Sequence, residues 1–407
     1  MDTVVKALLL ENIHPLATEL LSGRGIDVAT AAGSLDEDEL IDALEGVSLL
    51  GIRSKTTVSE RVLASRPDLQ AIGVFAIGTN QVDLDAAVHR GVATFNAPFS
   101  NTRSVVELAL AEIIALTRRL TEKDKAMHSG VWDKSATGAH EVRGRTLGIV
   151  GYGNIGTQLS VLAEALGMRV VFYDTAEKLA LGNARRMPDL DSLLEISDAV
   201  TLHVDGRPGN AGMFGREQFR RMKPGAIFLN LSRGFLVDYS YLREAIGSGA
   251  LAGAAVDVFP EEPKANGARF DSELRGLPNV ILTPHIGGST EEAQQDIGVF
   301  VAGKLRDYLI AGSTSLSVNM PTLTLEPPKP GQQRITHLHR NVPGVLAEVN
   351  QALSSGGANI DSQMLATSGQ VGYVVTDITG ELPEHARRHL REIEATIRVR
   401  ELDAPGS

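Results

Sequence analysis

The order of apolar and polar positions along the first hundred residues predicts short strands that alternate with helices. Three apolar runs suit buried strands: Val5–Leu10, Val47–Ile52 and Leu69–Gly73. An amphipathic stretch lies between them at Asp36–Leu44, and Ser34 with Glu37 has the spacing of a capping box. We therefore interpret the acidic run 36–39 as a helix start and not as a binding site. This alternation indicates parallel βαβ units.

A second region of the same kind begins near Ser104, where apolar residues recur at helical spacing and Glu107 completes another predicted capping box. Apolar runs separated by helix-compatible segments follow: Thr146–Val150, Arg169–Tyr173, Ala199–His203, Ala226–Leu231, Gly253–Val256 and Asn279–Leu282. This order predicts a complete doubly wound parallel sheet.

The last third of the chain predicts a return helix, a linker and a small domain. Ser289 and Glu292 mark the start of a helix that runs to about Leu309. Four prolines between residues 321 and 330 exclude a central strand or helix there. We expect one domain from residues 1–100 and 289–320, a second from 101–288, a linker at 321–330 and a third domain from 331–407.

Composition excludes several classes of protein. The net charge of -11, from 39 basic and 50 acidic residues, argues against a nucleic-acid surface. The absence of cysteine excludes disulfides, thiolate metal sites and cysteine nucleophiles. No apolar stretch approaches the roughly 20 residues of a membrane span, and the run Val4–Leu10 is too short for a signal peptide. We expect a cytoplasmic protein with no membrane or nucleic-acid partner.

A GxGxxG sequence stands between a predicted strand and a predicted helix at Ile155–Leu166, with its glycines at Gly151, Gly153 and Gly156. Such glycines permit the tight turn, the approach of a pyrophosphate and the packing of helix on strand. The next strand ends at Asp174, whose carboxylate would bind ribose hydroxyls and repel a 2′-phosphate. Since Thr175 and Ala176 supply no arginine for that phosphate, the sequence predicts NAD and not NADP.

Polar residues follow three strands at the sheet edge where a doubly wound fold binds its ligands. Arg233 follows the strand at 226–231, Glu262 lies just beyond the strand at 253–256, and His285 follows the strand at 279–282. Beside a nicotinamide, this set suits the redox chemistry of a 2-hydroxy acid. Arg233 would bind the carboxylate, His285 would exchange the hydroxyl proton, and Glu262 would raise the imidazole pKa.

In combination, these segments resemble the D-isomer-specific 2-hydroxyacid dehydrogenase family. The motifs lie at Gly148–Gly156, Asn230–Gly234, Asp257–Pro263 and Thr283–Gly288. The resemblance implies an α/β fold with a Rossmann-type NAD domain and a flavodoxin-like discontinuous substrate domain. It gives Arg233, Glu262 and His285 the same catalytic roles. It also implies cofactor contacts at Asn154, Ile155, Asp174, Leu231, Ser232, Arg233, Asp257, His285, Ile286, Gly287 and Gly288.

Three motifs near the N-terminus, at Gly51–Thr56, Ile77–Asp83 and Phe95–Arg103, resemble the members of this family that oxidise 3-phospho-D-glycerate at the first step of serine synthesis. The resemblance covers essentially the whole chain and implies a homotetramer. It implies substrate contacts at Arg53, Ser54, Asn80, Asn101 and, from a neighbouring subunit, Lys134. Lys55 would add positive charge, and a solvated Lys134 fits the sequence equally well.

The tail resembles an ACT domain, a βαββαβ module that binds amino acids at a subunit interface, in the segments Ile335–Leu346 and Gly357–Ile360. The resemblance implies L-serine as an effector held by His339, Asn341 and Asn359, whose imidazole and amides suit a zwitterion. Arg340 departs from the family pattern, which commonly has an acid there, and this change affects the expected strength of inhibition.

Two further function classes remain open on sequence alone. One is a dehydrogenase for an unphosphorylated 2-hydroxy acid, and the other is an NAD-sensing interaction protein on the same scaffold. We expect no metal site. His385 and His389 have a suitable helical spacing, but arginines surround them and no third ligand is evident.

Overall fold

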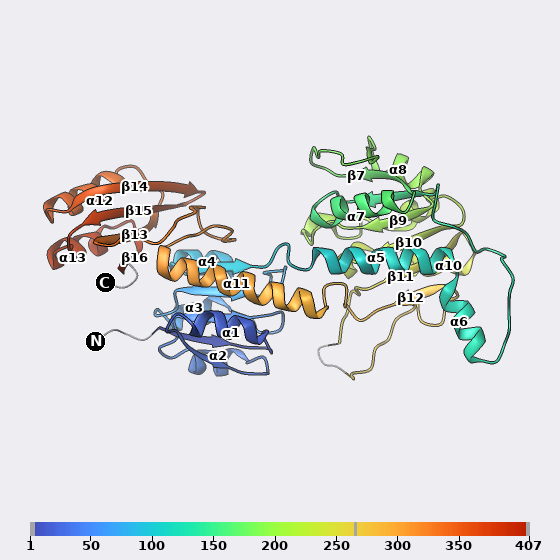
Figure 1. Cartoon of the computed structure of the whole chain (residues 1–407), viewed down its shortest axis with the longest axis horizontal. Coiled ribbons are helices and arrows are strands. Elements are labelled where there is room, and N and C mark those ends of the chain that lie inside the picture. The colour runs from blue at the N-terminus through green and yellow to red at the C-terminus, as the bar shows by residue number, and fades with distance from the viewer. Residues whose placement is uncertain (1–4, 264–266, 404–407) are drawn as a thin grey trace. The chain divides into compact units, whose positions relative to one another are not determined.

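The computed structural model describes residues 5–263 and 267–403, so residues 1–4 and 404–407 of the expected terminal domains lie outside it. The chain divides into two compact units: one from residues 1–100 and 294–407, and one from residues 101–293. Within the described residues there are two parallel sheets and one antiparallel sheet, which confirms the predicted α/β class (Figure 1).

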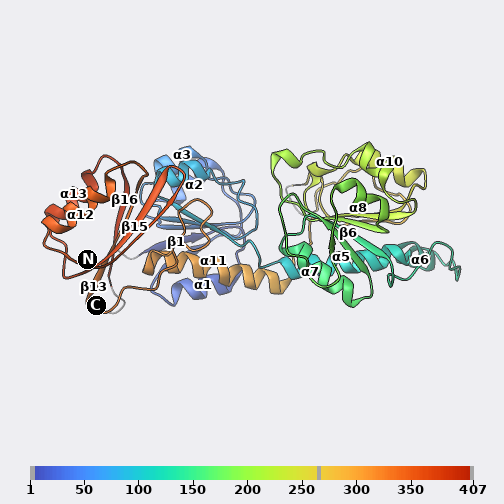
Figure 2. The ribbon, with the colours of Figure 1, turned by 90° about the horizontal axis from the view of Figure 1, so that it is seen from above.

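The first sheet belongs to the first unit and has the strand order β2-β1-β3-β4-β5, all parallel, which is the flavodoxin-like order. Its strands are β1 (Lys6–Leu9), β2 (Asp27–Thr30), β3 (Leu49–Ile52), β4 (Ala71–Val74) and β5 (Ala93–Asn96). The helices between them are α1 (Pro15–Ser22), α2 (Glu37–Ala43), α3 (Glu60–Ser65) and α4 (Leu84–His89). The return helix α11 (Glu291–Ala311) lies beside α1 in both views and packs into the same core through Val301 and Leu305 (Figures 1 and 2).

The second unit is built on a seven-stranded parallel sheet with the order β12-β11-β10-β9-β6-β7-β8. Its strands are β6 (Thr146–Val150), β7 (Arg169–Tyr173), β8 (Arg185–Arg186), β9 (Ala199–Leu202), β10 (Ala226–Asn230), β11 (Leu251–Val256) and β12 (Val280–Leu282). Its helices are α5 (Thr102–Thr117), α6 (Leu120–His128), α7 (Asn154–Ala165), α8 (Leu190–Ile196), α9 (Arg216–Arg221) and α10 (Tyr239–Gly247). The strand order reverses at β6, so this is the expected Rossmann-type sheet with its ligand edge at the ends of β6 and β9.

None of the three predicted capping boxes forms at the predicted residues: two caps are displaced and one is absent. Asp36, not Ser34, caps α2. The Asp36 carboxylate accepts the Glu39 N–H at 2.9 Å, and the Glu39 carboxylate accepts the Asp36 N–H at 3.0 Å. Helix α5 begins at Thr102 after Asn101, without a side-chain cap. Thr290, not Ser289, accepts the Ala293 N–H at the start of α11. Several polar residues stand near the starts of α2 and α11, and the local backbone decides which of them caps the helix.

The tail forms the antiparallel sheet β14-β15-β13-β16 with two helices, which is the predicted βαββαβ order. Its elements are β13 (Gln332–Arg340), α12 (Val345–Ser355), β14 (Asn359–Ser368), β15 (Val371–Thr379), α13 (Glu384–Glu392) and β16 (Thr396–Asp403). The pair Arg334–Asp377 is buried in this sheet, and Arg334 also donates to the Ala311 and Glu326 carbonyls. Among the described residues, no helix has the length and apolarity to cross a bilayer.

Candidate active site

The predicted dinucleotide turn lies between the end of β6 and the start of α7, at the point where the strand order reverses. A Cβ on Gly156 would lie 2.3 Å from the Gly151 carbonyl oxygen, so only glycine allows α7 to pack this closely on the turn. Space is open where a Cβ would project from Gly153, which precedes α7. An open turn before a free helix N-terminus fits a pyrophosphate.

Asp174 follows β7, as predicted, and both of its carboxylate oxygens are engaged within the protein. They accept the backbone N–H groups of Tyr152 and Ala176, each at 2.8 Å. The sequence argument considered only Thr175 and Ala176 as neighbours and missed Arg186 on β8. Its guanidinium donates to the carbonyls of Asp174 and Ala176 at 3.2 and 3.3 Å. A cation therefore does lie beside the predicted ribose site, although both of its contacts are to backbone oxygens.

The loop after β10 holds Arg233 in a network of backbone contacts. The Asn230 side chain accepts the Ser232 N–H at 3.1 Å and donates to the Arg233 carbonyl at 3.0 Å. A Cβ on Gly234 would meet the Phe259 carbonyl at about 2 Å, so glycine lets this loop pack directly on the turn that carries Glu262. The structure thus brings Arg233 close to Glu262, as the sequence predicted from separate strands.

His285 and Glu262 form the predicted pair. The imidazole Nδ1 lies 2.9 Å from Glu262 Oε2, and the second carboxylate oxygen accepts the Phe259 N–H at 3.0 Å. The hydrogen bond to Glu262 raises the pKa of His285 above its ordinary value, although burial opposes this shift. Burial alone would raise the pKa of Glu262, but the bonds from His285 and Phe259 hold it below its ordinary value. The imidazole stays half-exposed, so its Nε2 edge suits proton exchange with a ligand.

Asp257 organises the loop that carries His285. Its carboxylate accepts the Thr283 hydroxyl at 2.6 Å and the N–H groups of Ile286 and Gly287 at 2.8 Å, and it is 1% exposed. The His285 N–H donates to the Asp257 backbone carbonyl at 2.8 Å. The sequence placed Asp257 among the cofactor contacts. Its carboxylate is turned into the protein and holds the turn of residues 283–287, which includes the predicted contacts His285 and Ile286.

Sequence analysis missed Glu112, a 3% exposed acid on α5. Neither carboxyl oxygen has a hydrogen-bond partner among the described residues. Burial, with a smaller contribution from the charge of Asp257, raises the pKa of Glu112 to about 8. A lone glutamate inside an apolar helical pattern gave the only signal in the sequence, and it did not indicate a partner.

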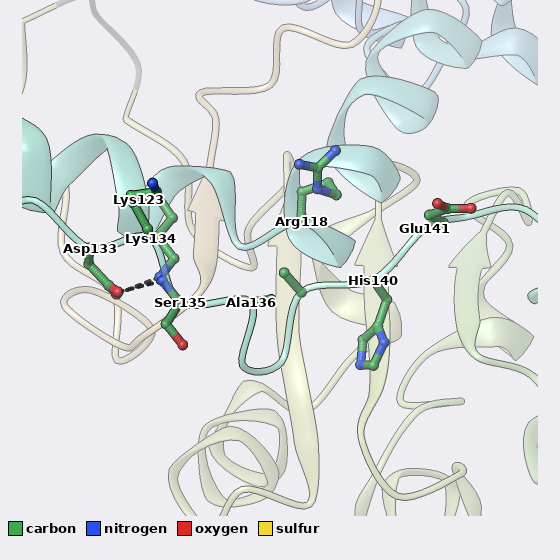
Figure 3. A pocket seen from close by; sticks show the side chains of 9 residues that line it. Arg118, Lys123, Asp133, Lys134, Ser135, Ala136, His140 and Glu141 are labelled. Atoms are coloured by element: carbon green, nitrogen blue, oxygen red, sulfur yellow. Dashed lines mark hydrogen bonds and ion pairs between the residues drawn. The ribbon is translucent and has the colours of Figure 1, made fainter.

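The predicted substrate residues are divided between the two units. Arg53 and Ser54 follow β3, and Asn80 is exposed in the loop before α4, all in the first unit. Asn101 is in the second unit, where its side chain lies against Gly288. Lys134 is exposed and lines a pocket with Arg118 and His140, beside the ion pair Lys123–Asp133 (Figure 3). Glu141 also lines the pocket, so its lining combines three cations with two carboxylates.

The three predicted effector residues do not converge within one chain. His339 is buried near the end of β13, with Nδ1 2.8 Å from the Arg340 carbonyl. Asn341 follows it and is tied to the turn after β14 by bonds to Gly369 and Gln370. Asn359 begins β14, level with Thr379 and thus with the start of β13. It lies roughly 24 Å along the sheet from His339, at about 3.4 Å per residue.

Comparisons with known proteins agree with this geometry. The model of the D-isomer specific 2-hydroxyacid dehydrogenase NAD-binding domain matches residues 110–287, and that of the acetohydroxyacid synthase (AHAS) small subunit-like ACT domain matches residues 335–398. D-3-phosphoglycerate dehydrogenase of Dictyostelium discoideum is 47% identical over 98% of this chain and 97% of its own length. The Escherichia coli K12 enzyme of that name is 48% identical over 97% of each.

Among solved structures, D-lactate dehydrogenase of Aquifex aeolicus, complexed with NAD and lactic acid, superposes with a TM-score of 0.67 at 25% identity. The match covers 78% of this chain and 100% of the Aquifex chain. Together with the family model, it confirms the predicted NAD cofactor.

Replacing Glu112 by Gln should stabilise the protein at alkaline pH. Between the ordinary pKa of 4.5 and the raised value of about 8, the folded chain binds a proton that the unfolded chain has released, so stability falls as pH rises. The Gln variant lacks this loss. We expect its melting temperature to exceed that of the wild type by several degrees near pH 9 and to converge with it near pH 4, below the ordinary pKa of 4.5. Glu107→Gln, exposed on the same helix, is the control. Parallel wild-type and Glu112→Gln curves would show that Glu112 is ionised in the folded chain.

Proposed function

This chain belongs to the D-3-phosphoglycerate dehydrogenases of the D-isomer-specific 2-hydroxyacid dehydrogenase family, and we propose that it oxidises 3-phospho-D-glycerate to 3-phosphohydroxypyruvate with NAD. The observation that carries this proposal is the His285–Glu262 pair beside Arg233, at the sheet edge that also bears the dinucleotide turn. The domain limits stated from the sequence are part of the proposal: residues 1–100 and 289–320 bind substrate, 101–288 bind NAD, and 331–407 regulate.

The nicotinamide of NAD supplies the hydride acceptor when it is bound. Its pyrophosphate would lie at the 151–156 turn, and its ribose hydroxyls beside Asp174. Arg233 holds the substrate carboxylate through two parallel hydrogen bonds. The neutral His285 imidazole takes the proton from the C2 hydroxyl as hydride leaves the same carbon. Glu262 then faces an imidazolium and stabilises its charge.

Side chains of the first unit are proposed to bind the substrate phosphate. Arg53 and Ser54 lie on one loop after β3, and Asn80 lies on another. Asn101 from the second unit and Lys134 from a neighbouring subunit complete the proposed substrate set. A guanidinium and hydroxyl suit a phosphate because both donate to its oxygens. An unphosphorylated acid would leave the Arg53 and Ser54 side chains, on the loop after β3, without a phosphate to bind. These side chains therefore favour the phosphorylated substrate.

Glu262→Gln should move the pH dependence of oxidation. Glu262 raises the pKa of His285, and oxidation needs the neutral imidazole, so the wild-type rate falls on the acid side of that raised pKa. The Gln variant should have its acid limb at lower pH, with a reduced rate at every pH because it stabilises the imidazolium less well. The measurement is kcat/KM for NADH formation across pH. An acid limb at the wild-type position would assign that limb to another group.

Arg53→Ala should separate the two dehydrogenase interpretations. Loss of a phosphate contact should raise KM for 3-phospho-D-glycerate about tenfold or more while KM for D-glycerate changes little. NADH formation with 3-phospho-D-glycerate, D-glycerate and D-lactate should be measured side by side for both proteins. Equal effects on phosphorylated and unphosphorylated acids would move the phosphate site elsewhere. Absence of turnover with all three in the wild type would favour the NAD-sensing alternative.

We propose a homotetramer, because each unit exposes apolar surface suited to a second copy. In the second unit, Leu120, Met127, Val131 and Trp132 are all exposed, and Trp132 is 74% accessible. In the tail, β14 is an exposed edge strand of ten residues that carries Ile360, Met364 and Leu365. Exposed apolar edges of this kind are templates for pairing with another chain. The cytoplasmic location remains a prediction.

The tail is proposed to bind L-serine between two copies. Antiparallel pairing of β14 with a second β14 would place the partner's Asn359 beside Ser368, at the end where this strand begins its turn. Asn341 is bonded to that turn, and His339 is level with Gly372, just after the same turn. Three residues that stand far apart in one chain would thus meet in a dimer. Arg340 donates to Glu394 outside this group, so its positive charge is partly balanced there.

Serine inhibition should be lost in Asn341→Ala and in Asn359→Ala, and restored in part when the two variants are mixed in one dimer. A hybrid dimer keeps one site with both asparagines intact if the site joins two chains, and none if it lies within one chain. The measurement is inhibition of NADH formation by serine in purified hybrids carrying two different tags. Retained inhibition in both homomeric variants, or no recovery in the hybrid, would contradict the proposed site.

A further inference from the structure

The Glu11 carboxylate accepts hydrogen bonds from backbone N–H groups of the loop that precedes α3. It follows β1 and is 8% exposed. One carboxylate oxygen accepts the N–H groups of Ser54 and Lys55, both at 3.0 Å, and the other accepts the Thr56 N–H at 2.8 Å. Three successive N–H groups of one loop therefore converge on a single carboxylate supplied from another part of the first unit.

The backbone at Glu11 is held in a conformation that aims its side chain at this loop. Glu11 and the next residue, Asn12, both have positive φ, at 64° and 53°. Bonds from the Leu10 N–H to Gly51 and from the Glu11 N–H to Gly33 fix the segment on two sides. Non-glycine residues in this region are uncommon, and a pair of them needs support from the surrounding structure.

The same loop is held from its other side by Gln81. The Gln81 side-chain amide donates to the Arg53 carbonyl, and its backbone carbonyl accepts the Val58 N–H at 2.8 Å. The Arg53–Thr56 loop is thus fixed by a carboxylate on its N–H groups and an amide on a carbonyl. The Arg53, Ser54 and Lys55 side chains make none of these contacts, so they stay available for a ligand.

Converging backbone N–H groups form a site for an anion such as phosphate. Here the anion is the chain's own carboxylate. Burial would raise the pKa of Glu11, but the bonds from Thr56 and Lys55 hold it below its ordinary value, so the group is ionised at neutral pH. A substrate phosphate is therefore excluded from these three N–H groups, which leaves the Arg53 and Ser54 side chains of this loop to bind it.

We propose that Glu11 is a positioning residue for substrate, which fills the N–H groups of residues 54–56 and so presents Arg53 and Ser54 to the substrate phosphate. This inference rests on the proposed function, because it takes the phosphorylated acid as the ligand of that loop. It goes beyond the motif in two ways: the phosphate is not bound by the N–H groups of residues 54–56, and a carboxylate distant in sequence sets the geometry of the side chains that bind it.

The test compares full-length wild type, Glu11→Gln and Glu11→Ala by steady-state kinetics. We expect both variants to raise KM for 3-phospho-D-glycerate about tenfold or more, with a much smaller change in kcat and in the KM for NAD, because the donors lose a charged acceptor. Glu19→Gln, an exposed acid on α1 of the same unit, is the matched control and should match the wild type.

Formate supplies a second measurement that a general loss of stability would not reproduce. In Glu11→Ala the three N–H groups are left without their carboxylate, and added formate should lower the raised KM toward the wild-type value, with no such effect on the wild type or Glu19→Gln. A KM equal to the control in both Glu11 variants, or a raised KM that formate leaves unchanged, overturns the inference. A wild type that fails to oxidise 3-phospho-D-glycerate overturns the proposed function instead.

Discussion

The buried carboxylate of Asp257 is the interaction on which the His285 site depends. The loop after β12 has to turn back over the sheet edge, and His285 adopts a positive φ of 55° to do so. That conformation costs energy for a residue with a Cβ. Three bonds to one carboxylate, from Thr283, Ile286 and Gly287, offset this cost and fix where the imidazole projects. Charged acceptors make the stronger hydrogen bonds, so an acid suits this position better than an amide.

A buried anion of this kind constrains its surroundings. Glu112 lies close enough for the Asp257 charge to raise its pKa. Ionising two neighbouring buried carboxylates together costs free energy, because their negative charges repel each other. Asp257 has three hydrogen-bond donors and Glu112 has none among the described residues, so Glu112 is the one that keeps a proton. The charges that act on the pKa of His285 are those of Glu262 and Asp257, which raise it, and that of Arg233, which lowers it.

The sequence predicted those parts of the fold and site that depend on patterns within one segment. Strands β6 and β7 have the predicted bounds because each is a continuous buried run between turn residues. The sequence also predicted that Arg233, Glu262 and His285 lie together, because a doubly wound sheet binds its ligands at the carboxyl ends of its strands. The caps of α2 and α11 were displaced because several neighbouring residues have capping side chains. Glu11 was missed because the N–H groups that it accepts from, at residues 54–56, are distant in sequence. Glu112 was missed because it has no hydrogen-bond partner among the described residues. Arg186 was missed because only the two residues directly after Asp174 were considered as its neighbours.

In the tail, the residues proposed to bind serine lie too far apart to meet within one chain. An antiparallel sheet places the start of β14 and the end of β13 at opposite ends, so Asn359 and His339 are separated by the length of the strands themselves. No change of side-chain rotamer closes a gap of roughly 24 Å. A second copy with its β14 running the opposite way would close this gap by symmetry, because each end of β14 would then meet the opposite end of the other chain's β14. In this arrangement the effector would contact both chains, and its binding free energy would depend on how they pair. An effector that binds one pairing better than another shifts the population toward that pairing, so regulation and assembly would be a single equilibrium.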